Sequence, residues 1–131
     1  MVGNGHRPTG PVGRAGEDAA AQWLSDHGLR IVDRNWRSGH KEIDIVAESP
    51  ERLHIVEVKT LSVSEDLTSA LDPAEKVGSA KQSRLIAAAK HYIAVNHILK
   101  EVQFDVVAVR LHSDGLSDIE YIPEAFIPIV R

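Results

Sequence analysis

Cysteine is absent from the 131-residue sequence, which excludes a disulfide framework and a cysteine-based zinc site. No stretch approaches the roughly 20 consecutive apolar residues that a membrane-spanning helix needs. No apolar segment follows Met1, as one would in a secretory signal peptide. Excess positive charge is missing too: the net charge of −4 argues against an indiscriminate coat on nucleic acid but stays compatible with a local basic groove. We therefore expect a cytoplasmic protein with no membrane partner.

Several signals of common active sites are also missing. The sequence has no glycine-rich phosphate loop and no internal repeat. Its seven histidines include no pair at the spacing of metal ligands on one helix, since His91 and His97 are six residues apart. The sequence alone neither supports nor excludes a Ser-His-Asp triad. The chemistry must therefore be sought among the charged residues.

The length fits one domain with a modest core. Residues 1–12 are polar and rich in glycine and proline, which predicts a flexible N-terminal arm before a single domain over residues 13–131. Apolar periodicity predicts helices over residues 15–27 and 85–93. Strands are expected over residues 29–36, 41–47, 53–59, 103–111 and 119–122, with Asp114-Gly115 as a hairpin turn and residues 123–126 as a last helical turn.

The strand over residues 53–59 carries two charges in an apolar, β-branched run. Glu57 and Lys59 point to the same side because strand side chains alternate. Charges on a strand covered on both faces need partners. In the preceding strand, period two places Ile43 and Ile45 on one face and Asp44 on the other.

A hairpin between these two strands would bring two acids together. If its register is symmetric about Pro50-Glu51, opposed residue numbers sum to 101, so Asp44 faces Glu57 with Cβ atoms about 5 Å apart. Facing carboxylates repel, and a proton, Lys59 or a divalent cation would offset the repulsion. The alternative is an ion pair across the hairpin between Glu42 and Lys59, with Asp44 and Glu57 half solvated.

Two further acids have local explanations. Glu17 lies three residues before Ala20 and seven before Leu24, at the start of the apolar face of the first helix. An acid in a first turn is also favoured by the helix dipole, which is the simpler interpretation. Asp105 is expected to be a cap or an arginine partner rather than a metal ligand.

The basic residues allow two interpretations each. Lys81 and Arg84 border the apolar stripe of the second helix, where they would either bind phosphate or form an ordinary solvated face. Arg34 and Arg37 flank Trp36, which suggests either a nucleic-acid contact or a strand end with Trp36 packed in the core. The residue types alone favour the second interpretation in both cases.

The ordered motifs resemble the YraN family of small bacterial proteins and, more broadly, the PD-(D/E)xK nuclease superfamily. They are GRAGEDAA (residues 13–20), RNWR (34–37), EIDIVA (42–47), VEVKT (56–60), residues 74–77 with Lys81, FDVVAV (104–109) and residues 119–126. The resemblance covers nearly everything after Val12. It implies an α/β, restriction-endonuclease-like fold with a mixed central sheet flanked by helices, in the order helix, three strands, helix, two strands.

The resemblance also implies a role for each matched residue. Asp44 and Glu57 would bind Mg²⁺ or Mn²⁺ with the Val58 carbonyl, and Glu17 would complete the acidic cluster. Lys59 would orient the attacking water and stabilise charge on the phosphate. Contacts to nucleic acid would come from Lys81, Gln82, Arg84 and Arg37. The implied function is a metal-dependent nuclease; the alternative is a non-catalytic nucleic-acid-binding module that retains the fold.

One position departs from the family pattern. Such sequences often carry an arginine after the Lys-Thr pair, where this chain has Leu61 in a predicted loop over residues 60–72. The implied partner is nucleic acid, DNA rather than RNA, and the resemblance leaves a homodimer open because many nuclease-like folds act as dimers.

Overall fold

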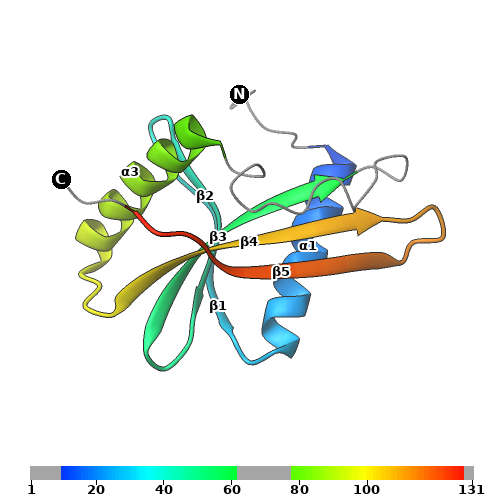
Figure 1. The fold of residues 1–131 in the computed structure, drawn as a ribbon, viewed down its shortest axis with the longest axis horizontal. Coiled ribbons are helices and arrows are strands. Elements are labelled where there is room, and N and C mark those ends of the chain that lie inside the picture. Colours follow the sequence, from blue (N-terminus) through cyan, green and yellow to red (C-terminus); the bar gives the residue numbers. More distant parts are fainter. Residues whose placement is uncertain (1–9, 62–77, 129–131) are drawn as a thin grey trace.

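The computed structural model describes residues 10–61 and 78–128. They form, in chain order, α1 (Pro11–Asp26), β1 (Arg30–Ser38), β2 (Lys41–Glu48), β3 (Arg52–Leu61), α3 (Ser79–Asn96), β4 (Glu101–Leu111) and β5 (Ser117–Phe126) (Figure 1). This is the predicted order of elements. No helix within the described ranges is long and apolar enough to cross a membrane.

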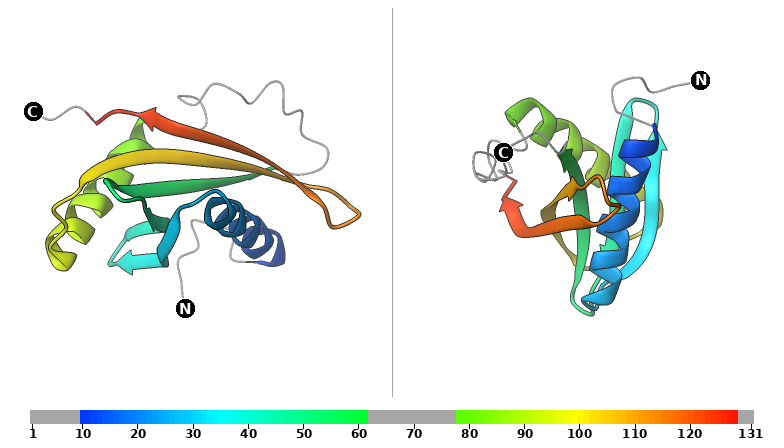
Figure 2. Two further views of the ribbon diagram at one scale, coloured as in Figure 1. Left: turned by 90° about the horizontal axis from the view of Figure 1, so that it is seen from below. Right: turned by 90° about the vertical axis from the view of Figure 1, so that its right-hand side faces the viewer.

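The strands form one mixed sheet in the order β1-β2-β3-β4-β5. β3 and β4 are parallel, and the other neighbouring pairs are antiparallel. The β4–β5 hairpin turns at Asp114-Gly115, where Gly115 has a φ of +87° and Asp114 Oδ1 accepts a 3.0 Å hydrogen bond from the Leu116 N–H. The turn projects beyond the rest of the fold (Figures 1 and 2). The predicted α/β class, with a mixed sheet and flanking helices, is confirmed.

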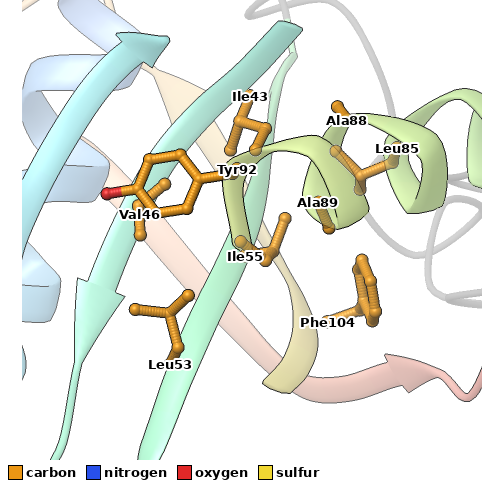
Figure 3. Packing of buried hydrophobic residues seen from close by; sticks show 9 residues of the cluster. All are labelled: Ile43, Val46, Leu53, Ile55, Leu85, Ala88, Ala89, Tyr92 and Phe104. Carbon is orange, nitrogen blue, oxygen red and sulfur yellow. The ribbon is translucent and has the colours of Figure 1, made fainter. Parts of the chain in front are cut away.

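Alternate residues of β3 pack against different helices, so the sheet is covered on both faces. Leu53 and Ile55 join a cluster with α3, whereas Val56 joins a cluster with α1. Figure 3 shows the α3 cluster, in which Leu85, Ala88, Ala89 and Tyr92 gather against Ile43, Val46, Leu53, Ile55 and Phe104. The α1 cluster contains Ala20, Ala21, Leu24, Ile45, Ala47, Val56, Val107 and Val109. The predicted two-sided burial of β3 is thus confirmed.

The predicted alternation of β2 is wrong at its centre. Ile43 packs with α3 and Ile45 packs with α1, so the two side chains lie on opposite faces. The β1–β2 register shifts between Ile31 and Asp33, and it stays constant from the pair Arg34–Ile45 to the pair Trp36–Ile43. Between these two pairs, Asn35 takes a left-handed φ of +52°, a conformation that asparagine tolerates better than most residues.

Several predicted boundaries also change. Helix α1 begins at Pro11, since proline suits the first turn of a helix, so the last residues of the predicted 1–12 arm are helical. Residues 123–126 belong to β5 rather than to a helical turn. Thr60 and Leu61 are the last residues of β3, and the rest of the predicted 60–72 loop lies outside the described residues. Leu61 is buried, so this departure from the family pattern is a core residue.

Trp36 packs as the structural interpretation predicts, whereas Arg34 is ion-paired within the chain rather than simply solvated. The Trp36 ring packs against the α3 cluster and meets the Tyr92 ring edge-on, with centroids 5.3 Å apart. Arg34 forms a 2.7 Å ion pair with Asp18 of α1. The indole is therefore part of the core, and it is not presented for stacking on a base.

Candidate functional site

A cavity of about 400 Å³ lies between the β2–β3 hairpin and the first turns of α3. Its lining combines acids, bases and one apolar side chain: His40, Glu42, Asp44, Glu57, Lys81, Arg84 and Leu85. The acids come from β2 and β3, and Lys81 and Arg84 come from α3. One wall is therefore acidic and the opposite wall is basic.

The hairpin register explains where the cavity forms. Backbone pairing follows the predicted sum of 101 from Glu48–Leu53 to Ile45–Val56, and the paired region ends there. Asp44 and Glu57 would have been the next pair. The ladder thus stops where two carboxylates would face each other directly, an arrangement that destabilises a sheet.

Asp44 is held at this point by the backbone of β3. Its side chain is buried, and its Oδ2 accepts a 2.9 Å hydrogen bond from the Val58 N–H. The carboxylate thereby replaces the ladder bond that the strands do not make and fixes the Asp44 rotamer. The contact also brings the Val58 backbone beside Asp44, so two of the predicted metal-binding residues are adjacent.

Glu57 is paired with the helix rather than with β2. Its Oε2 lies 2.9 Å from Lys81 Nζ, and its side chain is only 13% exposed. Ile55, two residues earlier, packs against α3, so Glu57 lies on the face that alternation in β3 predicts. Lys81 therefore supplies the positive charge that the hairpin argument required.

The basic wall is anchored by helical spacing. Lys81, Arg84 and Leu85 recur at i, i+3 and i+4, which places them on one side of α3. Leu85 is buried in the α3 cluster and fixes this side against the sheet (Figure 3). Of the residues predicted to contact nucleic acid, Lys81 and Arg84 line the cavity, whereas Gln82 and Arg37 do not.

Of the predicted catalytic and metal-binding residues, Glu17, Val58 and Lys59 are not among those that line the cavity. Lys59 is exposed and does not line the cavity. Glu17 is buried on the α1 side, 4.0 Å from the Arg34 guanidinium, and it does not line the cavity either. Its burial follows from its neighbour: a methyl group added at Gly16 would overlap Thr60 Oγ1, so α1 touches β3 here.

The donor set fits a hard cation held by few protein ligands. No group of three His, Cys, Asp or Glu side chains is placed to hold a metal ion within residues 10–61 and 78–128. Mg²⁺, however, is commonly held by one or two carboxylates together with waters and substrate phosphates. Asp44 and Glu57 meet that requirement from one cavity wall. The Lys81 ammonium shows that a cation is attracted to Glu57.

A second polar cluster was missed in the sequence. Ser49 Oγ lies 3.0 Å from His54 Nε2, and His54 Nδ1 lies 2.8 Å from Asp105 Oδ2. Asp105 also accepts hydrogen bonds from the Tyr121 hydroxyl (2.7 Å), the Gln103 amide (2.9 Å) and the Glu124 N–H (3.0 Å). The arginine partner predicted for Asp105 is wrong. Polar residues inside the apolar runs Leu53–Val56 and Phe104–Val107 were the available signal.

These hydrogen bonds govern protonation in the cluster. Burial raises the pKa of the Asp105 carboxyl group, but the donors from His54, Tyr121, Gln103 and Glu124 outweigh it and leave the pKa below its usual range. Burial and the Asp105 carboxylate raise the pKa of Tyr121 well above its usual value. His54 and Asp105 are both buried, so these hydrogen bonds link β3, β4 and β5 inside the protein.

Comparison with known proteins identifies relatives that match most of the chain. Residues 16–109 match the family described as "Uncharacterised protein family UPF0102". The chain is 43% identical over 117 residues to a UPF0102 protein of Bacteroides thetaiotaomicron, covering 89% of this chain and 93% of the relative. It is 38% identical over 125 residues to a UPF0102 protein of Treponema pallidum (strain Nichols), covering 91% and 94%. The resemblance to the YraN family, another name for this group, is confirmed.

Proposed function

The chain belongs to the UPF0102 family, and we propose that its cavity is the active site of a metal-dependent nuclease. One observation supports this above all others. Asp44 and Glu57, both largely shielded from water, share a cavity with Lys81 and Arg84. Carboxylates attract a divalent cation, and the basic side chains attract the phosphate that such a cation accompanies. The expected superfamily is PD-(D/E)xK.

The residues of the cavity would have different roles in phosphodiester hydrolysis. Asp44 and Glu57 would hold Mg²⁺ or Mn²⁺, with the Val58 carbonyl as an additional oxygen donor. When bound, the ion supplies positive charge against the phosphate oxygens and favours attack by water. Arg84, exposed on α3, positions a backbone phosphate. Water adds its oxygen to phosphorus, one ester bond breaks, and the released oxygen takes a proton, leaving a monoester and a hydroxyl group.

The substrate and surroundings form part of the same proposal. We place nucleic acid, DNA rather than RNA, in the cavity, and the protein in the cytoplasm. Phosphate contacts from Lys81 and Arg84 would position the strand without reading its sequence. Binding should therefore weaken as salt rises.

A non-catalytic binding module is the second candidate function. It is favoured by the separation of Glu17 from the cavity lining, which leaves two carboxylates rather than three in the expected metal set. It is also favoured by the Glu57–Lys81 ion pair, which leaves Glu57 neutralised within the chain. This candidate predicts salt-dependent binding of nucleic acid without turnover.

The deciding experiment is a cleavage assay with Asp44→Asn as the critical variant. The asparagine oxygen can still accept the Val58 N–H, so the hairpin is kept while the charge is lost. Labelled single-stranded, duplex and branched DNA, and RNA, are incubated with the full chain in Mg²⁺ or Mn²⁺. We expect cleavage by the wild-type protein and, because a charge that holds the ion is lost, at least about a hundredfold less by Asp44→Asn.

The matched control is Asp26→Asn, the same chemical change at an exposed residue near the end of α1. It should cleave like the wild type, and all three proteins should melt within a few degrees of one another. Binding without cleavage of any substrate would favour the non-catalytic module. If the protein neither binds nor cleaves any of these substrates, both the nuclease and the binding module are refuted.

A further inference from the structure

Two lysines near Glu57 are candidates for the contact to the substrate phosphate. Lys59 follows Glu57 by two residues on β3, whereas Lys81 reaches it from α3. Only Lys81 is among the residues that line the cavity in the described part of the chain, and its Nζ lies 2.9 Å from Glu57 Oε2. Lys59 is exposed. The helical lysine is therefore the one that lines the cavity and contacts Glu57.

The support beneath Lys81 is rigid. Leu85 lies one turn further along α3 and is 2% exposed, and Ala88 behind it is fully buried. These side chains pack against the sheet and fix the rotation of the helix (Figure 3). The Lys81 stem starts from this fixed point, and its head is partly open to water, with 45% of the side chain exposed. A flexible stem on a rigid base allows the ammonium to exchange partners without moving the backbone.

We propose that Lys81 contacts the scissile phosphate, and that its ammonium exchanges with a divalent cation at Glu57. This inference rests on the proposed function. In the free chain, Lys81 neutralises Glu57. When the cation binds, Glu57 turns to it and Lys81 is released toward a non-bridging phosphate oxygen, beside Arg84.

The energetics permit the exchange. A partly exposed ion pair contributes only a factor of a few to an equilibrium constant, so a divalent ion can displace the ammonium. Removing Lys81 should therefore have effects of opposite sign. Cation affinity rises because a competitor and a nearby positive charge are lost. Nucleic-acid cleavage falls because the phosphate loses its lysine.

The test measures Mn²⁺ binding by calorimetry, without nucleic acid, and cleavage separately. For Lys81→Met we expect roughly three- to tenfold tighter Mn²⁺ binding. We also expect at least about tenfold slower cleavage, because one charged contact to the phosphate is lost. Lys59→Met is the matched control, and we expect its Mn²⁺ affinity to stay within about twofold of the wild type. Lys81→Arg should keep Mn²⁺ affinity near that of the wild type because the charge remains. Lys81→Gln is a second neutral variant, and thermal melting checks that each protein folds.

The outcomes separate this inference from the proposed function. Unchanged or weaker Mn²⁺ binding in both Lys81→Met and Lys81→Gln overturns the exchange. Unchanged cleavage in both Lys81→Met and Lys81→Gln overturns the assignment of the phosphate contact to Lys81. Tighter Mn²⁺ binding in Lys81→Met, in a chain whose wild type cleaves nothing, supports the exchange while refuting the nuclease.

Discussion

Replacing Asp105 with alanine should be among the most damaging single changes in this protein. The side chain is fully buried, and its two oxygens accept four hydrogen bonds, from His54, Gln103, Tyr121 and the Glu124 N–H. Gln103 is half-buried and Glu124 is exposed, so water can replace the carboxylate at both, which leaves the donors of His54 and Tyr121 without an acceptor. At about 1–3 kcal/mol for each of these two donors left unsatisfied, the loss is about 2–6 kcal/mol.

Asp105→Asn is the matched control. The amide oxygen can replace one carboxylate oxygen, and the new NH₂ group meets the other pair of donors. His54 can change tautomer and the Tyr121 hydroxyl can rotate, so both can accept instead of donating. We therefore expect a loss of only about 1–3 kcal/mol for this variant.

Urea denaturation, followed by circular dichroism, measures both losses at neutral pH. A series in acid tests the charge separately. Because the pKa of Asp105 is lower in the folded chain than in the unfolded one, its carboxylate stabilises the fold above about pH 4, and this contribution is lost as the pH falls through the folded-state pKa. Asp105→Asn should lack that part of the acid dependence. An Asp105→Ala protein within about 1 kcal/mol of the wild type would refute the reasoning.

Two further predictions concern the tyrosines and the contact of α1 with β3. Burial and the hydrogen bond to Asp33 raise the pKa of Tyr92 to about 12, and the pKa of Tyr121 is also raised, so neither tyrosine of the chain should ionise in an absorbance titration at about pH 10. Stability should fall as the pH rises above about 10, because the unfolded chain ionises first; a native midpoint near pH 10 would contradict this. Gly16→Ala should destabilise the fold by about 1–3 kcal/mol, measured by urea denaturation, because the methyl group meets Thr60, and Thr60→Ala should recover part of the loss. Equal destabilisation of the single and double variants would refute that explanation.

The order of elements and the β2–β3 register were predictable because their signals are local. Alternation, the turn at Pro50-Glu51 and the Asp114-Gly115 turn each act over a few residues. The placement of Ile43 and Ile45 on opposite faces was not predictable, because the period of two was inferred from the β2 sequence alone. A pattern confined to residues 41–47 cannot report the conformation of its partner.

The candidate site also combines features that local sequence signals predict with features that they do not. Asp44 and Glu57 were brought to one cavity by a register that the sequence supplies. The partner of Glu57 was not predictable: Lys81 is 24 residues later, and its reach depends on how α3 packs against the sheet. The His54–Asp105 contact depends likewise on the parallel pairing of β3 with β4, which no local pattern in either strand specifies.

The mixed topology of the sheet also sets an order of assembly. The paired residues of the β2–β3 hairpin are at most 11 positions apart, as Ile45 is from Val56, whereas the parallel pairs of β3 and β4 are 49 apart, as Arg52 is from Glu101. Loop closure favours the short separation, so we expect the hairpin to form early and the β3–β4 pair to form late. The two acids would then meet before α3 delivers its lysine. If the two acids bind a divalent cation as proposed, such ions should speed refolding by relieving that repulsion during the search for the native sheet.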